Sequence, residues 1–221
     1  MLLPVPDMRA IVTRHYKTII NAAERILGWG DSPPNHDWED DLSFVDETLL
    51  KREIKFKAVY SSMLERSRKT AMFHAKRHGI KLIYDSPALN EVNYGDLYNK
   101  KKKWVAERYP QHKKDPDFVY PGGESFREMQ QRSVSYFSSL ASIHSGETIL
   151  LVVHAGVIRG LICHFVGLDY AENLKRRISH RYIGEFLFDG KTCVRYDELG
   201  KPSGFVKEGV IELPCKCSMP V

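Results

Sequence analysis

The sequence predicts an α/β protein: a three-layer α/β/α sandwich with a mostly parallel central sheet and one antiparallel edge strand. Two observations support this fold class. Short apolar runs alternate along the chain with segments of helical periodicity, and that alternation is typical of a parallel sheet covered by helices on both faces. Near the end of the chain, two strand-like segments flank a Gly-containing turn at residues 189–191. Such a pair predicts a β-hairpin, which would supply the antiparallel edge.

Each element follows from its local sequence. Strands are expected at residues 10–13, 56–60, 81–84, 147–153, 182–188 and 193–196. Helices are expected at residues 20–27, 42–52, 64–78, 100–109, 123–142 and 157–166, with Gly79 and Pro110 ending two of them. Residues 28–35 and 110–123 are expected to be loops. The helix at 123–142 has the clearest apolar stripe, formed by Phe126, Met129, Phe137 and Leu140.

Length and composition limit the class of protein. The chain has 221 residues, which suits one sizeable domain. We expect a single domain over residues 1–221, with its core at about 9–213 and a short flexible tail at 214–221. A hydrophobic share of 43% is ordinary for a soluble protein. No apolar run is as long as a membrane span, and the first residues lack the layout of a secretion signal. These features predict a cytoplasmic protein with no membrane partner.

The charge and the cysteines narrow the expected ligands. The formal charge of +5 mildly favours anionic ligands, but it is too small and too dispersed to predict nucleic-acid binding. Cys163 and Cys193 lie in apolar segments and are expected to be buried thiols. Cys215 and Cys217 are separated by one residue, which is tighter than the usual zinc spacing, and no second pair completes a site. We therefore expect no metal, while the role of this pair stays open.

Two histidines are expected to mark the functional site. His15 follows the first apolar run directly after Arg14, and His154 follows the run at 147–153. In open α/β sheets, ligands bind in the crevice beyond the carboxyl ends of the strands. Two histidines at such ends, one of them beside an arginine, predict a phosphate-handling site.

The motifs around these histidines resemble those of the histidine phosphatase superfamily. This is the branch that contains cofactor-dependent phosphoglycerate mutases and small-molecule phosphatases. The likeness runs in order through most of the chain. It comprises Arg14-His15 with Thr18, Asn21, Arg25 and Gly28-Trp29, then residues 61–66 (SSMLER), 88–91 (ALNE) with Tyr94-Gly95, 121–125 (PGGES) and 154–159 (HAGVIR). The last motif is similar to that of α-ribazole phosphatase. The resemblance implies a phosphoglycerate mutase-like fold.

The resemblance also implies a role for each residue. His15 is the expected nucleophile, because a neutral imidazole carries a free lone pair near pH 7. His154 is the expected second catalytic histidine, and Glu91 the expected general acid and base. Phosphate binding is assigned to Arg14, Asn21, Arg66 and Ala155, since guanidinium forks match phosphate oxygens. The substrate pocket is assigned to Tyr16, Gly28, Trp29 and Tyr94. No cofactor is implied.

Two departures from the family pattern bear on the reaction. Tyr16 stands where the family usually has glycine, so its ring is expected to reshape the pocket unless it turns away. Cofactor-dependent mutases have an adjacent arginine pair after the general-acid loop. The matching residues here, 99–122, contain a single arginine, Arg108. Water is therefore favoured as the final phosphoryl acceptor.

The expected function is hydrolysis of a small phosphorylated metabolite through a phosphohistidine on His15. Two alternatives stay open: a cofactor-dependent phosphoglycerate mutase, and a non-catalytic phospho-ligand-binding protein on the same fold, which Tyr16 motivates. The expected partner is the small metabolite, and a homodimer is an open alternative to a monomer.

Overall fold

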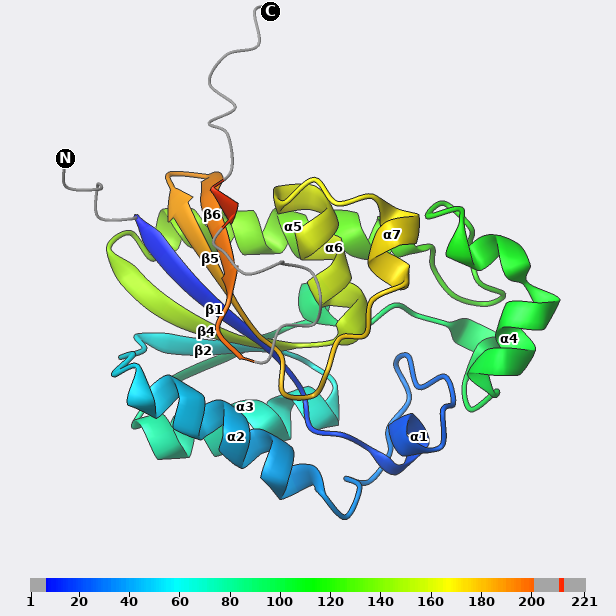
Figure 1. Cartoon of the computed structure of the whole chain (residues 1–221), viewed down its shortest axis with the longest axis horizontal. Helices are drawn as coiled ribbons and strands as arrows, with labels where there is room; N and C mark the ends of the chain where they lie inside the picture. The colour runs from blue at the N-terminus through cyan, green and yellow to red at the C-terminus, as the bar shows by residue number, and fades with distance from the viewer. Residues whose placement is uncertain (1–6, 201–210, 213–221) are drawn as a thin grey trace, which may run out of the picture.

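One sheet organises the computed structural model, which describes residues 7–200 and 211–212 (Figure 1). The described strands lie in the order β3-β2-β4-β1-β5-β6-β7. The parallel part comprises β1 (Met8–Arg14), β2 (Ala58–Ser62), β3 (Leu82–Ser86) and β4 (Glu147–Val153). The antiparallel part comprises β5 (Ile183–Asp189), β6 (Thr192–Glu198) and β7 (Ile211–Glu212). The predicted fold class is confirmed, and the antiparallel edge is the predicted hairpin extended by β7.

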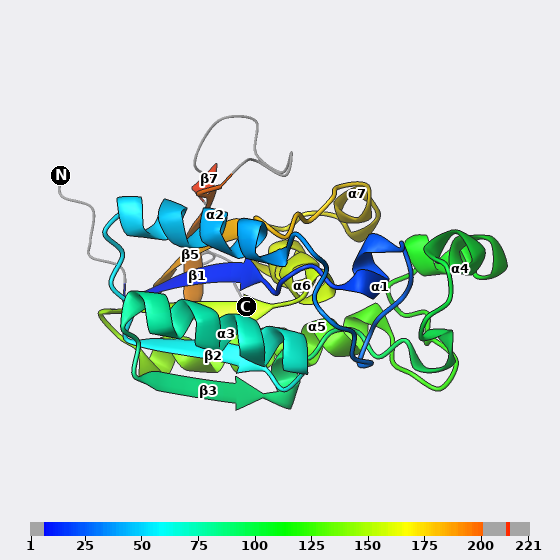
Figure 2. The same cartoon turned by 90° about the horizontal axis from the view of Figure 1, so that it is seen from below.

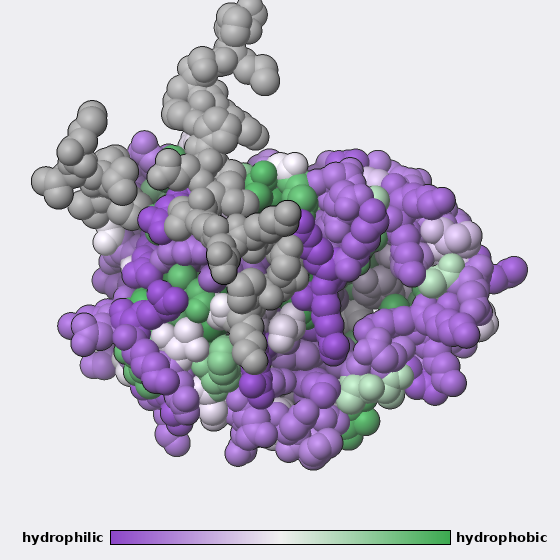
Figure 3. Space-filling model, viewed as in Figure 1, coloured by the Kyte–Doolittle hydropathy of each residue, from purple (hydrophilic) through white to green (hydrophobic). Residues whose placement is uncertain are grey.

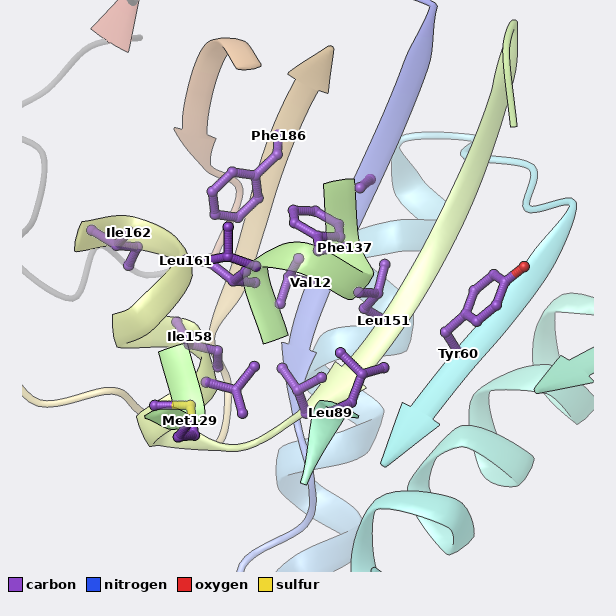
Figure 4. Close-up of a cluster of buried hydrophobic side chains, with 14 of the residues drawn as sticks. Val12, Tyr60, Leu89, Met129, Phe137, Leu151, Ile158, Leu161, Ile162 and Phe186 are labelled. Atoms are coloured by element: carbon purple, nitrogen blue, oxygen red, sulfur yellow. The ribbon is translucent and has the colours of Figure 1, made fainter. Parts of the chain in front are cut away.

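Helices cover both faces of this sheet. On one face lie α2 (Trp38–Lys51) and α3 (Glu65–His78), seen in front of the strands in Figure 2. On the other lie α5 (Phe126–Ile143) and α6 (Ala155–Phe165). Successive side chains of a strand point to opposite faces of the sheet, so the core has one part on each face. Val12 and Leu151 face α5 and α6 (Figure 4), whereas Ile11 and Leu150 belong to the core on the α2 and α3 side.

Local signals set the ends of the long helices. The hydroxyl of Ser125 accepts from the backbone N–H of Glu128, whose carboxylate in turn accepts from the N–H of Ser125, so a capping box begins α5. Gly79 ends α3 in the left-handed conformation at φ 64°, which glycine adopts without steric cost. The predicted apolar stripe of α5 is buried: Phe126, Met129, Phe137 and Leu140 are each at most 5% exposed.

Some elements differ from the sequence-based expectation. The helix expected at residues 20–27 shrinks to α1 (Ile19–Ala22), because Glu24 takes a φ of 53° and Arg25 then forms a β-bridge with Lys101. Five short elements carry no periodic signal long enough to predict their bounds. They are α7 (Tyr170–Leu174), η1 (Pro87–Leu89), η2 (Gly95–Leu97), η3 (Pro110–Lys113) and β7.

The surface and the remaining predictions complete this picture. The face in Figure 3 is mostly hydrophilic, with small separate hydrophobic areas. Within residues 7–200 and 211–212, no helix has the length and apolar character needed to cross a membrane, and no cluster of three metal-ligating side chains occurs. Cys193 is buried and Cys163 partly buried. Cys215 and Cys217, with the tail at 214–221, lie outside the described residues.

Candidate active site

Strand pairing brings the two histidines together. β1 and β4 are parallel neighbours, and their register aligns Arg14 with Val153. His15 directly follows β1 and His154 directly follows β4, so the two histidines leave the sheet side by side. The backbone N–H of His15 donates to the carbonyl of Val153 at 3.0 Å, and the two imidazole centroids lie 4.9 Å apart.

A cavity of about 620 Å³ opens beside His15. It lies at the carboxyl ends of the parallel strands, on the side where α1 and α4 (Lys102–Arg108) extend beyond the arrowheads (Figure 2). Most residues assigned to the site from the sequence line it: Arg14, His15, Asn21, Gly28, Arg66, Glu91, Tyr94 and Ala155. His154 is not among the lining residues; it is fully buried directly beside His15, which does line the cavity.

The surroundings of His15 fix its tautomer. Its Nδ1 lies 2.6 Å from the carbonyl oxygen of Tyr16, and a carbonyl only accepts, so Nδ1 carries the proton. Burial and, next, the positive charge of Arg66 hold the pKa of His15 well below 6.5. The ring is therefore neutral at pH 7 with its lone pair on Nε2. The Nε–H of Arg66 donates to that lone pair at 3.3 Å, which directs Nε2 toward the guanidinium.

Burial of the site histidines makes the stability of the protein depend on pH. It holds the pKa of His15, His154 and His180 well below 6.5, so below pH 6.5 the unfolded chain binds more protons than the folded protein. The free energy of unfolding should therefore fall as the pH drops from 7 to 5.5, by at most about 1.4 kcal/mol per pH unit for each histidine. Urea unfolding across this range measures the slope. The slope should be smaller in His180→Gln, and equal slopes for the two proteins contradict the prediction.

Two guanidinium groups face His15: that of Arg66 is buried and that of Arg14 is half-buried. Arg66 donates from its two Nη atoms to the carbonyls of Gly28 at 2.6 Å and Gly30 at 2.8 Å. Arg14 donates to the carbonyl of Ile178 at 2.7 Å, and its Nε has no partner among the described residues. Burial lowers the pKa of both arginines to about 10, so both stay charged at neutral pH. Neither forms an ion pair with a described carboxylate, which leaves both charges available to an anion in the cavity.

Ser62 sets the proton on His154. The Ser62 hydroxyl oxygen accepts from the backbone N–H of Leu64. The Ser62 hydroxyl proton then donates to Nε2 of His154, which lies 2.6 Å away. His154 is neutral because burial and nearby arginines lower its pKa, so its remaining proton lies on Nδ1. That buried Nδ1 has no partner among the described residues. An unpaired buried donor beside His15 is suited to a phosphoryl oxygen bound there.

Glu91 lies in the loop after η1, and its carboxylate contacts the first turn of α6. Its carboxylate accepts from the backbone N–H of Gly156 at 3.2 Å and from that of Val92 at 3.0 Å. Its own carbonyl accepts from Arg132 at 2.9 Å and from the indole of Trp29 at 2.6 Å. The loop that carries this carboxylate is therefore held from both sides.

The close approach of Glu91 explains the glycine at position 156. A Cβ atom there would overlap the Glu91 carboxylate, so Gly156→Ala should push the carboxylate out of place. The resemblance implies that Glu91 is the general acid, and a displaced carboxyl group would transfer its proton less well. On that basis we expect kcat/KM for an alkyl phosphate to fall about 10- to 100-fold. Steady-state kinetics check this. Gly160→Ala is the matched control one turn later on α6, where a Cβ would meet Gln130 at an ordinary 3.4 Å. Similar losses in both variants would contradict the prediction.

The other residues assigned from the sequence divide into two groups. Asn21 lines the cavity with its Oδ1 accepting from the N–H of Thr18 at 3.4 Å, which leaves its amide Nδ2 for a ligand. Tyr94 lines it beside Tyr120, with ring centroids 4.6 Å apart. Tyr16 and Trp29, however, are not among the lining residues.

Their placement has a physical reason in each case. The ring of Tyr16 turns away from the cavity and packs edge-on against Trp38 of α2, 5.5 Å away. It is 3% exposed, so burial against α2 outweighs exposure at the site. The indole N–H of Trp29 donates to the Glu91 carbonyl, and Trp29 is 44% exposed. It supports the Glu91 loop rather than the pocket wall.

Sequence reasoning left several residues in the cavity wall or next to it unassigned. The Nδ1 of His180 donates to the carbonyl of His15 at 2.8 Å, since that carbonyl can only accept. Arg132, on α5, donates to the carbonyls of Pro87, Ala88, Asn90 and Glu91 and pairs with Glu124. Basic residues of the segment after α7 also line the cavity: Lys175, Arg176 and Arg177. The density of basic residues in that segment is the one sequence signal that points to it.

Comparisons with known proteins agree with this geometry. A model of the histidine phosphatase superfamily (branch 1) matches residues 10–196. A phosphoglycerate mutase of Schizosaccharomyces pombe is 30% identical over 178 residues, covering 76% of this chain and 84% of that protein. A metal-independent phosphoserine phosphatase of Arabidopsis thaliana is 34% identical over 157 residues, covering 68% of this chain and 66% of that protein.

Solved structures share the fold. Bacillus stearothermophilus YhfR superposes with a TM-score of 0.75 at 25% identity, covering 88% of this chain and 96% of that one. Structures that share the fold also include α-ribazole phosphatases and a phosphoglycerate mutase. Since the family model spans both histidines and the strands that carry them, the chain belongs to the histidine phosphatase superfamily.

Proposed function

We propose that this protein hydrolyses a phosphate monoester of a small metabolite through a phosphohistidine on Nε2 of His15. The observation that carries the proposal is the state of His15: a neutral ring with Nδ1 tied to the Tyr16 carbonyl and its lone pair on Nε2 at the cavity. Such a nitrogen attacks phosphorus without a separate base. Arg66 and Arg14 supply positive charge where the phosphoryl oxygens would lie.

The reaction proceeds in two balanced steps. In the first, Nε2 of His15 bonds to phosphorus as the ester P–O bond breaks, and the Glu91 carboxyl group gives its proton to the leaving alkoxide. In the second, water attacks the phosphohistidine and passes a proton to the Glu91 carboxylate, which releases inorganic phosphate and neutral His15. The Nδ1–H of His154, the amide of Asn21 and the backbone N–H of Ala155 are donors for the oxyanion in both steps.

The experiment is a screen for phosphate release. Purified protein is incubated without added metal with phosphate monoesters of sugars, amino acids, glycerate and a ribonucleoside. Release of inorganic phosphate from at least one of them, with a phosphoenzyme that is stable in alkali, labile in acid and mapped to His15, supports the proposal. Metal-free protein that releases no phosphate from any ester contradicts it.

A phosphoglycerate mutase is the second candidate function. One observation favours it: the relative from S. pombe, which matches over 84% of its own length, is named as such. The discriminating assay supplies 3-phosphoglycerate with a bisphosphate primer. Rapid formation of 2-phosphoglycerate without release of phosphate would replace hydrolysis by transfer as the function.

The non-catalytic alternative is less well supported. Its motive was that the Tyr16 ring would reshape the pocket, and the ring packs against Trp38 instead. Cytoplasmic location and a homodimer stay predictions.

A further inference from the structure

One arginine of the cavity has no part in the proposed reaction. Arg159 lies on α6, one turn after Ala155, and lines the same cavity as His15. Its Nη atoms donate to the carbonyls of Arg176 at 2.5 Å and Ala155 at 3.4 Å, and its Nε donates to that of Asn173 at 3.4 Å. A guanidinium has five N–H donors, so two of the five remain after these three bonds.

Arg159 resembles the two phosphate-facing arginines in its surroundings. Burial lowers its pKa, and like Arg14 and Arg66 it forms no ion pair with a described carboxylate. The lysines of the cavity differ, because each is neutralised: Lys17 by Asp37, Lys102 by Glu24 and Lys175 by Glu172. Arg159 is half-buried. A charge that is partly removed from water without a counter-ion is costly, and a ligand of opposite charge would offset that cost.

The charges of the cavity exceed what one phosphate group requires. Arg14 and Arg66 match the scissile phosphoryl group, and Glu91 is the one lining carboxylate without a lysine partner. Four further arginines line the cavity: Arg25, Arg159, Arg176 and Arg177. Of these, Arg159 lies on α6 closest in sequence to His154, and Arg177 is exposed at the rim. We propose that Arg159, with Arg177, binds a second anionic group of the substrate.

The position of Arg159 limits where that group lies. Ala155 and Arg159 are four residues apart, which is about 6 Å along the helix, and helical side chains lean toward the N-terminus. Its contact with the Ala155 carbonyl shows that it does so here. The field of Arg159 also acts to lower the pKa of Arg14. The second anion is therefore held a few bonds from the phosphorus, in a small compact substrate.

A carboxylate and a second phosphate both match this group. Each presents paired oxygens to a guanidinium fork. Residues 99–122 contribute one arginine, Arg108, which does not line the cavity. The proposed site for the second anion is therefore formed by α6 and the segment after α7, and not by an arginine of residues 99–122.

The test compares ligands that differ by one anionic group. The inference rests on the proposed function, so binding is measured by calorimetry with His15→Ala, which does not turn the ligands over. O-phosphoserine against phosphoethanolamine tests a carboxylate, and glycerol 1,2-bisphosphate against glycerol 1-phosphate tests a second phosphate at a similarly short distance. We expect the doubly anionic member of at least one pair to bind about tenfold more tightly or better. Equal affinities within both pairs overturn the inference without any change at Arg159.

Variants then assign the preference to Arg159. Adding Arg159→Gln should reduce the affinity ratio to about twofold or less for the ligand pair that shows the preference. Arg159→Lys should give a ratio between those of Arg159 and Arg159→Gln, because lysine keeps the charge and loses the fork. Lys175→Gln removes one positive charge from the rim and should leave most of the ratio in place. A ratio that survives Arg159→Gln, or falls equally in Lys175→Gln, overturns the inference. If Arg159→Gln does not fold, Arg159→Lys decides by the same ratio.

Failure of the two proposals can be told apart. A protein that releases no phosphate from any ester but shows the affinity ratio loses only the proposed function. A protein that hydrolyses esters and shows no ratio loses only the second-anion site.

Discussion

Replacing His15 by alanine is expected to lower kcat/KM for phosphate release by about 10⁴-fold or more, because it removes the proposed nucleophile. The cavity and its arginines stay in place, so ligand binding should persist. Phosphate release from a good substrate and from p-nitrophenyl phosphate measures the loss. The phosphoenzyme should also be absent.

The matched control is another buried histidine. His144 lies 2.6 Å from the Tyr60 hydroxyl and 2.8 Å from the Glu147 carboxylate, and it does not line the cavity. His144→Gln should therefore affect stability more than kcat/KM of the folded protein. If His15→Ala kept a phosphoenzyme or lost no more activity than His144→Gln, the nucleophile would lie elsewhere.

The part of the site that the sequence predicts depends on strands. His15 and His154 each follow an apolar run, and parallel neighbours end at the same edge of the sheet. That regularity was sufficient to expect them together. The position of Arg66 is also predictable from its motif. Arg66 lies in the first turn of α3, which starts shortly after β2 ends, so it is held near the same edge of the sheet.

The rest of the site depends on side-chain contacts between distant segments. The direction of the Tyr16 ring is decided by Trp38, and neither residue signals the other in the sequence. Arg132 lies on the polar side of an amphipathic helix, where a solvated arginine is the ordinary expectation, yet it holds four carbonyls of the Glu91 loop. Arg159 likewise gains its role from a segment that has no periodic pattern. Such roles follow from tertiary structure, which periodicity does not encode.

Burial explains why one cavity can hold so many cationic side chains beside neutral histidines. Desolvation is the largest influence on the pKa of His15, and the arginines add to it in the same direction. The result is an imidazole that stays unprotonated in a positive field. This suits the proposed mechanism, because a phosphate dianion is attracted without protonation of the nitrogen that would attack it. Exposed histidines in the same field would lack desolvation, which is the larger of the two influences on the pKa of His15.

Replacing Glu91 by glutamine should separate the two steps of the reaction. An alkyl phosphate needs a proton on its leaving oxygen, so its kcat/KM should fall about 10²- to 10⁴-fold. With p-nitrophenyl phosphate the leaving phenolate is stable without that proton, so kcat/KM should change little. The kcat for the same compound should fall, because attack of water on the phosphohistidine still lacks its base. Rapid-mixing kinetics should then show a burst of p-nitrophenol equal to the enzyme concentration.

Asp96→Asn is the matched control for this variant. Asp96 belongs to the same loop region, is exposed and does not line the cavity, so its loss should leave both substrates unaffected. Glu124 is not a substitute for Glu91, because its carboxylate is paired with Arg132 at 2.6 Å. A loss in Glu91→Gln that is the same for alkyl and aryl esters in kcat/KM would show that Glu91 acts by shaping the cavity. Proton transfer makes the loss depend on the leaving group, and no purely structural role of this carboxylate does so.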